Sequence, residues 1–133
     1  MSIILILYLM ENYYLFVYGT LKRGFGNNHL LHDADYICTA ISVDKYNISG
    51  YGFPCAYPNE DGKLLQGEIY LLSDKDFINT DMLEGNGSFY NREIRTFISD
   101  GKKIDAWIYI IMQPNEMTYN SDSSIINWGY KGY

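Results

Sequence analysis

A run of six aromatic or branched apolar residues that ends abruptly at a glycine constrains this chain more than any other feature. Residues 13–18, Tyr-Tyr-Leu-Phe-Val-Tyr, are short and rich in strand formers, which predicts a buried β-strand. The strand stops at Gly19, and Thr20 and Leu21 follow. Backbone N–H groups beyond such a strand can hold an anion, because glycine lets a ligand approach closely. A plain β-turn that binds nothing is the alternative interpretation.

Strand-like segments recur along the rest of the chain, at residues 36–43, 64–72, 90–99 and 104–112. The last two alternate apolar and polar positions and are joined by a turn at 100–102, so they predict a β-hairpin. Residues 50–58 predict a turn that feeds a short strand, and another turn at 59–62 predicts a hairpin with the strand that begins at Leu64. Helices do not alternate regularly with these strands. We therefore predict an α+β fold, a small and mostly antiparallel β-barrel with two or three short flanking helices.

One segment carries clear helix signals. Ser73 can cap the N-terminus, and Asp74 and Asp76 suit the first turn, where the helix dipole favours negative charge. The helix should run to about Leu83 and stop before Gly85, a typical residue for the C′ position. Its apolar stripe is expected to contain Phe77, Ile78, Met82 and Leu83.

The length of 133 residues suits a single domain with one core. The apolar run at the N-terminus is too short to span a bilayer and lacks the features of a signal peptide. Met10 is itself a natural start, so we expect residues 1–9 to be a dispensable extension and residues 10–133 to be the domain. The polar tail at 113–133 is expected to dock through its aromatic residues or to stay mobile.

Charge excludes two classes of partner. The formal net charge is −6, and the 10 lysines and arginines are scattered rather than gathered in a stripe. Nucleic-acid binding requires such a basic surface, and anionic membranes repel an acidic one. We therefore expect neither nucleic acid nor membrane as a partner; oligomeric state is left open.

Cysteine and histidine positions do not predict a metal centre. Cys38 and Cys55 are too few for a disulfide framework and lack the spacing of a zinc or redox motif. Two reduced, mostly buried thiols in a cytoplasmic protein are expected instead. His29 and His32 are three residues apart, but no further ligands are evident nearby, so solvated or packing histidines are the favoured interpretation.

Glu84 is the candidate for acid–base chemistry. It stands at the end of the predicted helix beside Gly85, where the negative pole disfavours a carboxylate. The apolar neighbours Met82 and Leu83 are expected to add desolvation. Both effects raise the pKa of a carboxyl group, as a general acid or base working near neutral pH requires. A surface glutamate at a fraying helix end is the alternative.

The stretch Val-Tyr-Gly-Thr-Leu at 17–21, followed by Lys-Arg-Gly at 22–24, resembles the signature loop of the γ-glutamyl cyclotransferase-like family. It is most similar to the γ-glutamylamine cyclotransferase branch, and glutathione-specific relatives match less well. Further matching segments follow in family order, at residues 52–58, 67–70, 83–84 and 89–92. The resemblance covers roughly residues 13–112 and implies a small β-barrel with flanking helices.

The resemblance also implies a reaction. The α-amine of a γ-glutamyl compound attacks its own γ-carbonyl, so that 5-oxoproline forms and an amine leaves, for example lysine from γ-glutamyl-ε-lysine. Glu84 falls on the position of the catalytic glutamate, and no cofactor or metal is required. The positions implied to bind this small-molecule substrate are Tyr18, Gly19, Thr20, Leu21 and Tyr90. The loop residues would supply backbone N–H donors, and the two tyrosines would supply pocket walls or hydroxyl donors.

Three alternatives stay open from the sequence. A cyclotransferase that acts on γ-glutamyl amino acids would share the same base and loop. A non-catalytic module could keep the pocket and recognise a small carboxylate ligand. A protein-interaction domain could instead use the many tyrosines, 14 in all, on its surface. A carboxylate at position 84 favours an enzyme, because a buried negative charge does not help a protein that only binds an acidic ligand.

Overall fold

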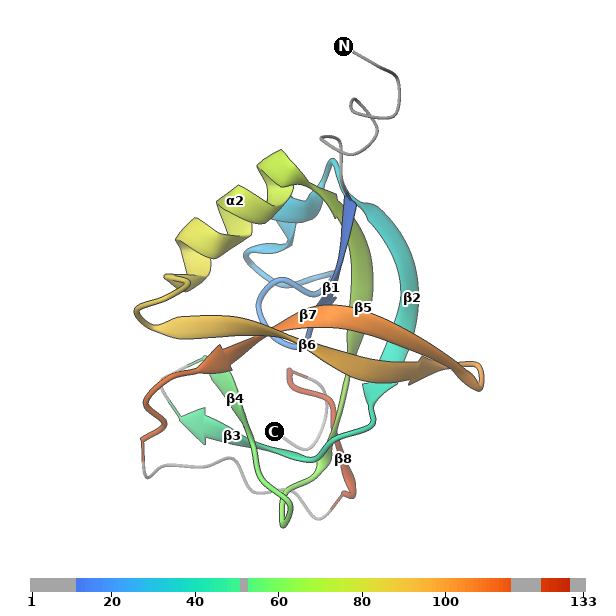
Figure 1. The fold of residues 1–133 in the computed structure, drawn as a ribbon, viewed down its shortest axis with the longest axis vertical. Coiled ribbons are helices and arrows are strands. Elements are labelled where there is room, and N and C mark those ends of the chain that lie inside the picture. Colours follow the sequence, from blue (N-terminus) through green and yellow to red (C-terminus); the bar gives the residue numbers. More distant parts are fainter. Residues whose placement is uncertain (1–11, 51–52, 116–122, 130–133) are drawn as a thin grey trace.

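A closed β-barrel forms the body of the molecule in the computed structural model, which describes residues 12–50, 53–115 and 123–129 (Figure 1). The barrel strands are β1 (Asn12–Val17), β2 (Asp35–Ser42), β5 (Leu64–Ser73), β6 (Tyr90–Ser99) and β7 (Lys102–Ile111). They follow one another in the order β1-β7-β6-β2-β5, and pairing of β1 with β5 closes the ring. The predicted barrel is confirmed. Residues 1–9 lie outside the described residues.

Most pairings in the barrel are antiparallel, as predicted, including the β6–β7 hairpin. The exception in the ring is β1 and β7, which run parallel with Leu15 opposite Trp107. Phe16 and Phe97 stack inside the barrel with ring centroids 4.0 Å apart. Gly67 lets β5 cross close to β1, because a Cβ there would collide with the Val17 carbonyl oxygen and the Phe16 ring.

The predicted hairpin between the short strand within residues 50–58 and the strand that begins at Leu64 is wrong. The turn itself forms, with the Gly62 N–H donating to the Asn59 carbonyl at 2.9 Å. However, β4 (Pro54–Pro58) pairs with β3 (Tyr46–Gly50) in a separate two-stranded sheet, while β5 continues into the barrel. After the turn, Lys63 pairs with Tyr46 of β3 rather than with β4. The backbone N–H of each residue donates to the carbonyl of the other, at 2.7 and 2.9 Å.

Two helical segments accompany the barrel among the described residues, the 3₁₀-helix η1 (Asn28–Leu31) and the helix α2 (Asp74–Glu84), which lies against the side of the barrel in Figure 1. The α2 boundaries follow their predicted signals, since the Ser73 hydroxyl accepts from the Asp76 N–H and Gly85 adopts a left-handed conformation with φ of 59°. The predicted apolar stripe is wrong beyond Phe77.

The side of α2 that faces the barrel is partly polar. Phe77 and Thr80 are buried, whereas Ile78 and Met82 are 59% and 77% exposed. Thr80 fits there because its hydroxyl donates to the Phe77 carbonyl and lies 2.9 Å from the Tyr109 hydroxyl. The buried face of α2 therefore combines apolar packing by Phe77 with hydrogen bonding by Thr80.

At the other end of the chain, the short strand β8 (Ile125–Ile126) runs parallel to the start of β5, with Leu64 opposite Ile125. Ile126 is buried against the barrel core. The described part of the tail therefore docks, as one of its two predicted behaviours, and it does so through the aliphatic Ile126 as well as through the aromatic Trp128, whose ring lies 5.2 Å from that of Phe25. Residues 116–122 and 130–133 lie outside the described residues.

Candidate functional site

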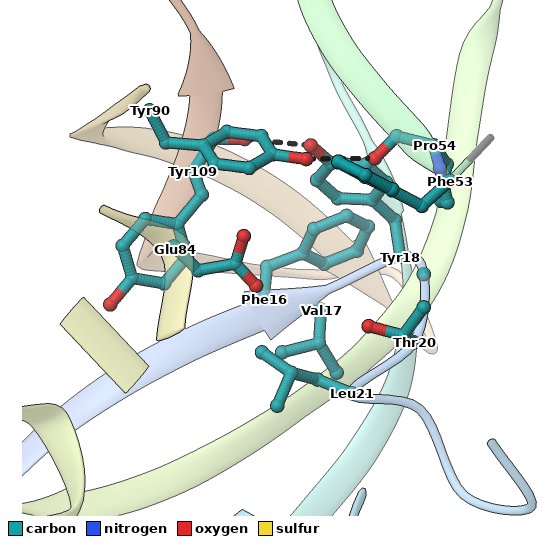
Figure 2. A pocket seen from close by; sticks show the side chains of 11 residues that line it. Phe16, Val17, Tyr18, Thr20, Leu21, Phe53, Pro54, Glu84, Tyr90 and Tyr109 are labelled. Carbon is teal, nitrogen blue, oxygen red and sulfur yellow. Dashed lines mark hydrogen bonds between the residues drawn. The ribbon is translucent and has the colours of Figure 1, made fainter. Parts of the chain in front are cut away.

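A pocket opens where β1 ends, between the signature loop and the C-terminal end of α2 (Figure 2). All the residues selected from the sequence line it, namely Tyr18, Gly19, Thr20, Leu21, Glu84 and Tyr90. Of the remaining lining residues, Phe16 and Val17 belong to the predicted first strand, and Phe53 and Pro54 belong to the matching segment 52–58, which the family resemblance implied as one wall of the pocket. The sequence did not single out Tyr109. The structure thus brings the selected positions together, while their chemical roles stay predictions.

The loop after β1 is held in a tight turn. The Lys22 N–H donates to the Gly19 carbonyl at 3.0 Å, and the Thr20 carbonyl and hydroxyl accept from the backbone and side chain of Asn27. Within the described chain, no hydrogen bond uses the N–H groups of Gly19, Thr20 or Leu21 as donors. Three neighbouring donors at the rim of a concave site can bind an anion or a developing oxyanion.

Gly19 is required by a close approach rather than by an unusual backbone conformation. An ideal Cβ built there would lie 2.5 Å from Cγ of Pro54, the first residue of β4. The small β3–β4 sheet therefore presses directly on the loop and forms the wall of the pocket opposite α2. The predicted role of this glycine was close approach of a ligand; the structure shows close approach of a second wall.

Glu84 is the last residue of α2, and Figure 2 shows its carboxyl pointing from the helix end into the pocket. Burial raises the pKa of this carboxyl from its ordinary value to about 7. The sequence led us to expect that Met82 and Leu83 would bury this carboxyl. They are not the main cause, because their side chains are 77% and 42% exposed. The aromatic barrel residues that line the pocket supply the apolar surroundings instead.

The hydroxyl groups of the two selected tyrosines are used within the scaffold. Tyr18 donates to the Tyr109 carbonyl at 2.8 Å and accepts from the Ala56 N–H at 3.0 Å. The Tyr90 hydroxyl donates to the Pro54 carbonyl at 3.0 Å and lies 3.2 Å from the Cys55 sulfur. Burial raises the pKa of Tyr18 and of Tyr90 well above the usual value, so both remain protonated. Their aromatic faces are walls of the site.

A polar cluster fixes the end of α2 just before Glu84. The Tyr109 hydroxyl donates to Asp81 Oδ1 at 2.5 Å, and the Arg92 guanidinium pairs with the same carboxylate at 2.9 Å. Arg92 also lies over the Phe77 ring, 4.0 Å from its centroid. Asp81 is one helical turn before Glu84, so these contacts fix the position of the helix backbone from which the Glu84 side chain extends. No sequence motif marks this cluster, because its members come from three elements.

None of the histidines and cysteines lines the pocket, although Cys55 contacts the Tyr90 hydroxyl behind its wall. His29 and His32 are on the surface, each with Nδ1 about 3 Å from a backbone carbonyl three residues earlier. Cys55 is buried and Cys38 is partly buried; neither forms a disulfide. The described residues contain no group of three or more potential metal ligands. Across the same parts of the chain, every helix is too short or too polar to cross a membrane.

Comparison with known proteins agrees with this architecture. Residues 15–128 match the family model described as γ-glutamyl cyclotransferase, AIG2-like. A provisionally named γ-glutamylcyclotransferase of Methanocaldococcus jannaschii is 35% identical over 98 residues, covering 72% of this chain and 82% of that protein. The Escherichia coli K12 γ-glutamylcyclotransferase family protein YtfP is 29% identical over 102 residues, covering 75% and 83% of the two chains.

Among solved structures, a mouse AIG2-like protein superimposes with a TM-score of 0.70 at 23% identity. The match covers 85% of this chain and 91% of the mouse chain, and it shows that the two share a fold. The sequence matches carry the relationship further, because the family model spans most of the chain, including the end of β1, the loop and Glu84. The chain therefore belongs to the γ-glutamyl cyclotransferase, AIG2-like family.

Proposed function

We propose that this protein is a γ-glutamylamine cyclotransferase. The α-amine nitrogen of a γ-glutamyl amide forms a bond to its own γ-carbonyl carbon, and the bond from that carbon to the amine nitrogen breaks. The products are 5-oxoproline and a free amine, such as lysine from γ-glutamyl-ε-lysine. No electrons are exchanged, and the reaction needs only proton transfer and charge stabilisation.

The observation that carries the proposal is the buried carboxyl of Glu84, which faces the loop of residues 19–21 across the pocket. With a pKa of about 7, it accepts and returns a proton near neutral pH. In this mechanism Glu84 takes a proton from the substrate α-ammonium group and later protonates the departing nitrogen. The α-ammonium nitrogen loses two protons as it becomes the lactam N–H, one before the attack and one after it. Glu84 can pass each in turn to the departing nitrogen, which gains two protons and leaves as an ammonium group.

The loop supplies the second part of the mechanism. Donors at the N–H groups of Gly19, Thr20 and Leu21 would bind the substrate carboxylate or the oxyanion that develops on the γ-carbonyl. The attacking amine is tethered to the carbonyl, so restricting the substrate to its reactive rotamer is worth about 7–11 kcal/mol in favourable cases. The aromatic walls at Tyr18 and Tyr90 support this restriction by narrowing the pocket.

Release of 5-oxoproline tests the proposal. We would compare γ-glutamyl-ε-lysine, γ-glutamyl-alanine and glutathione as substrates for the wild type and for Glu84→Gln. The matched control is Glu60→Gln, the same chemical change on an exposed turn. We expect release from the amine substrate that is lost in Glu84→Gln and retained in Glu60→Gln.

Other outcomes of this assay would change the assignment. Faster turnover of γ-glutamyl-alanine would assign the protein to the γ-glutamyl amino acid branch instead. If folded protein releases no 5-oxoproline from any of the three compounds, the proposal is wrong and a non-catalytic binding module becomes the better interpretation.

A further inference from the structure

A second hollow adjoins the Glu84 pocket. We call it the outer groove; its lining residues are Thr20, Asn27, Phe53, Leu83, Glu84, Phe89 and Tyr90. The volume open to the centre of a water-sized sphere is about 230 Å³ in this groove, compared with about 40 Å³ in the pocket next to it. Four residues line both spaces, namely Thr20, Phe53, Glu84 and Tyr90. The two are therefore parts of one site that meet at the Glu84 carboxyl.

The walls of the outer groove are mostly aromatic and aliphatic. The Phe89 ring lies 5.9 Å from the Phe53 ring and 5.0 Å from the Tyr90 ring, measured between centroids. The Asn27 amide donates to the Thr20 hydroxyl at 2.9 Å, so these two polar groups bond to each other. Among the described lining residues there is no lysine, arginine or histidine, and Glu84 carries the single carboxyl group.

We propose that the outer groove holds the leaving amine and selects amines with an apolar alkyl or arylalkyl body. This inference rests on the proposed function and specifies its substrate. The glutamyl half belongs in the inner pocket, because the loop residues Gly19, Thr20 and Leu21 all line that pocket and only Thr20 reaches the groove. The scissile amide then lies beside Glu84, and the amine substituent extends into the remaining space.

The chemistry of the groove determines which amines fit. An alkyl or benzyl group buries apolar surface against Phe53, Leu83 and Phe89, and aromatic pairs add a further favourable contact. An amino acid as leaving group would instead place its carboxylate one carbon from the scissile nitrogen. That position is close to Glu84, and the described groove offers no cation to pair with it. Lysine places charged groups at the far end of its side chain, where an apolar wall gives them no partner.

A substrate series that varies only the amine tests this inference. We would measure kcat/KM for γ-glutamyl-benzylamine, γ-glutamyl-butylamine, γ-glutamyl-ε-lysine and γ-glutamyl-alanine. We expect the benzylamine compound to exceed γ-glutamyl-ε-lysine by about tenfold, the size of one well-packed apolar group. Equal rates, or a preference for the lysine compound, would overturn the inference.

Two adjacent exposed residues of α2 provide a matched pair of variants. Leu83→Ser removes an apolar group from the groove, whereas Met82→Ser makes the same kind of change at a neighbour that does not line it. We expect Leu83→Ser to reduce the benzylamine advantage, mainly through KM, and Met82→Ser to preserve it. An equal effect of the two substitutions would contradict a contact between the amine and the groove.

Binding of unreactive analogues separates this inference from the proposed function. Glutaric acid monoamides keep the carboxylate and the amide but lack the α-amine, so they cannot cyclise. By calorimetry, we expect the benzylamide to bind about tenfold more tightly than N6-glutaryl-lysine. This preference without turnover of any substrate would support the groove and reject the cyclotransferase. Turnover without this preference would support the cyclotransferase and reject the proposed selectivity of the groove. Failure of both compounds to bind would also reject the groove.

Discussion

The buried ammonium group of Lys22 donates a 2.6 Å hydrogen bond to the backbone carbonyl of Trp128, which lies 106 residues later in the chain. It also donates to the side-chain oxygen of Asn127 at 3.0 Å. Next to this contact, the Trp128 ring lies 5.2 Å from the ring of Phe25. The segment after β8 therefore holds the loop that begins at Gly19. The described C-terminal segment is a structural support of the site, although none of its residues lines the pocket.

Lys22→Met should loosen this support, because methionine fills part of the volume but leaves the Trp128 carbonyl and the Asn127 amide oxygen without their donor. Loss of hydrogen bonds to a buried charged group costs about 1–3 kcal/mol. We expect lower stability in urea denaturation and a higher KM in 5-oxoproline release. Lys75→Met is the control on the exposed face of α2. An unchanged KM would show that the loop does not need this support.

The pH dependence of activity should report Glu84. Its carboxyl has a pKa of about 7 because of burial, and only the ionised form can accept the substrate proton. We expect kcat/KM to rise with pH up to about 7 and then to level off on this limb. A carboxyl with an ordinary pKa would instead give a flat profile from pH 5 upward, and that result would argue against Glu84 as the base.

Stability should respond to the same group with the opposite sign. The folded-state pKa of Glu84 is raised above its unfolded value, from 4.5 to about 7, so the folded protein binds the extra proton in this window. The protein should therefore lose stability as pH rises from about 4.5 to 7, by at most about 3 kcal/mol from this residue. Glu84→Gln removes the dependence. We expect the variant to gain stability over the wild type at pH 8 more than at pH 4, while it loses activity.

The sequence predicts well those features that depend on neighbouring residues. Ser73 and Gly85 mark the ends of α2 because a cap and a left-handed residue act within one turn. The break of β1 before Gly19 and the position of Glu84 at a helix end are visible for the same reason. Together with the resemblance to the family, these local signals selected positions that line one pocket.

Contacts between strands that are distant along the chain could not be predicted from the sequence. Tyr109 enters the pocket because β7 lies parallel to β1, a pairing that no local pattern encodes. The cause of the raised Glu84 pKa was likewise attributed to the wrong neighbours, since Met82 faces solvent and the barrel supplies the burial. The groove beside Leu83 depends on the same long-range packing.

Tyr109→Phe tests how strictly the end of α2 must be positioned. The substitution removes the hydroxyl that donates to Asp81 and leaves the Arg92 ion pair in place. We expect a stability loss of about 1–2 kcal/mol, and a larger decrease in kcat than increase in KM, because Glu84 is displaced rather than removed. The control is Tyr36→Phe, at an exposed tyrosine whose hydroxyl lies 3.0 Å from that of Thr39. It should leave stability, kcat and KM unchanged. Equal effects of the two substitutions would contradict a positioning role.

Gly19→Ala tests the contact between the loop and the small sheet. The new methyl would overlap the Pro54 ring, 2.5 Å from its Cγ, so the loop or β4 must move. We expect a decrease in kcat/KM, because the backbone donors of the loop shift relative to Glu84. Gly26→Ala is the control: its added methyl has no neighbour within 4 Å.

A double-mutant cycle makes this last expectation specific. Pro54→Ala removes the ring that the methyl of Gly19→Ala strikes, so the double variant should recover part of the activity that Gly19→Ala loses. Recovery would show that the collision with β4, rather than altered loop flexibility, displaces the donors. Strictly additive losses would mean that the two walls are not coupled through this contact, and that Gly19 serves the site by admitting the ligand itself.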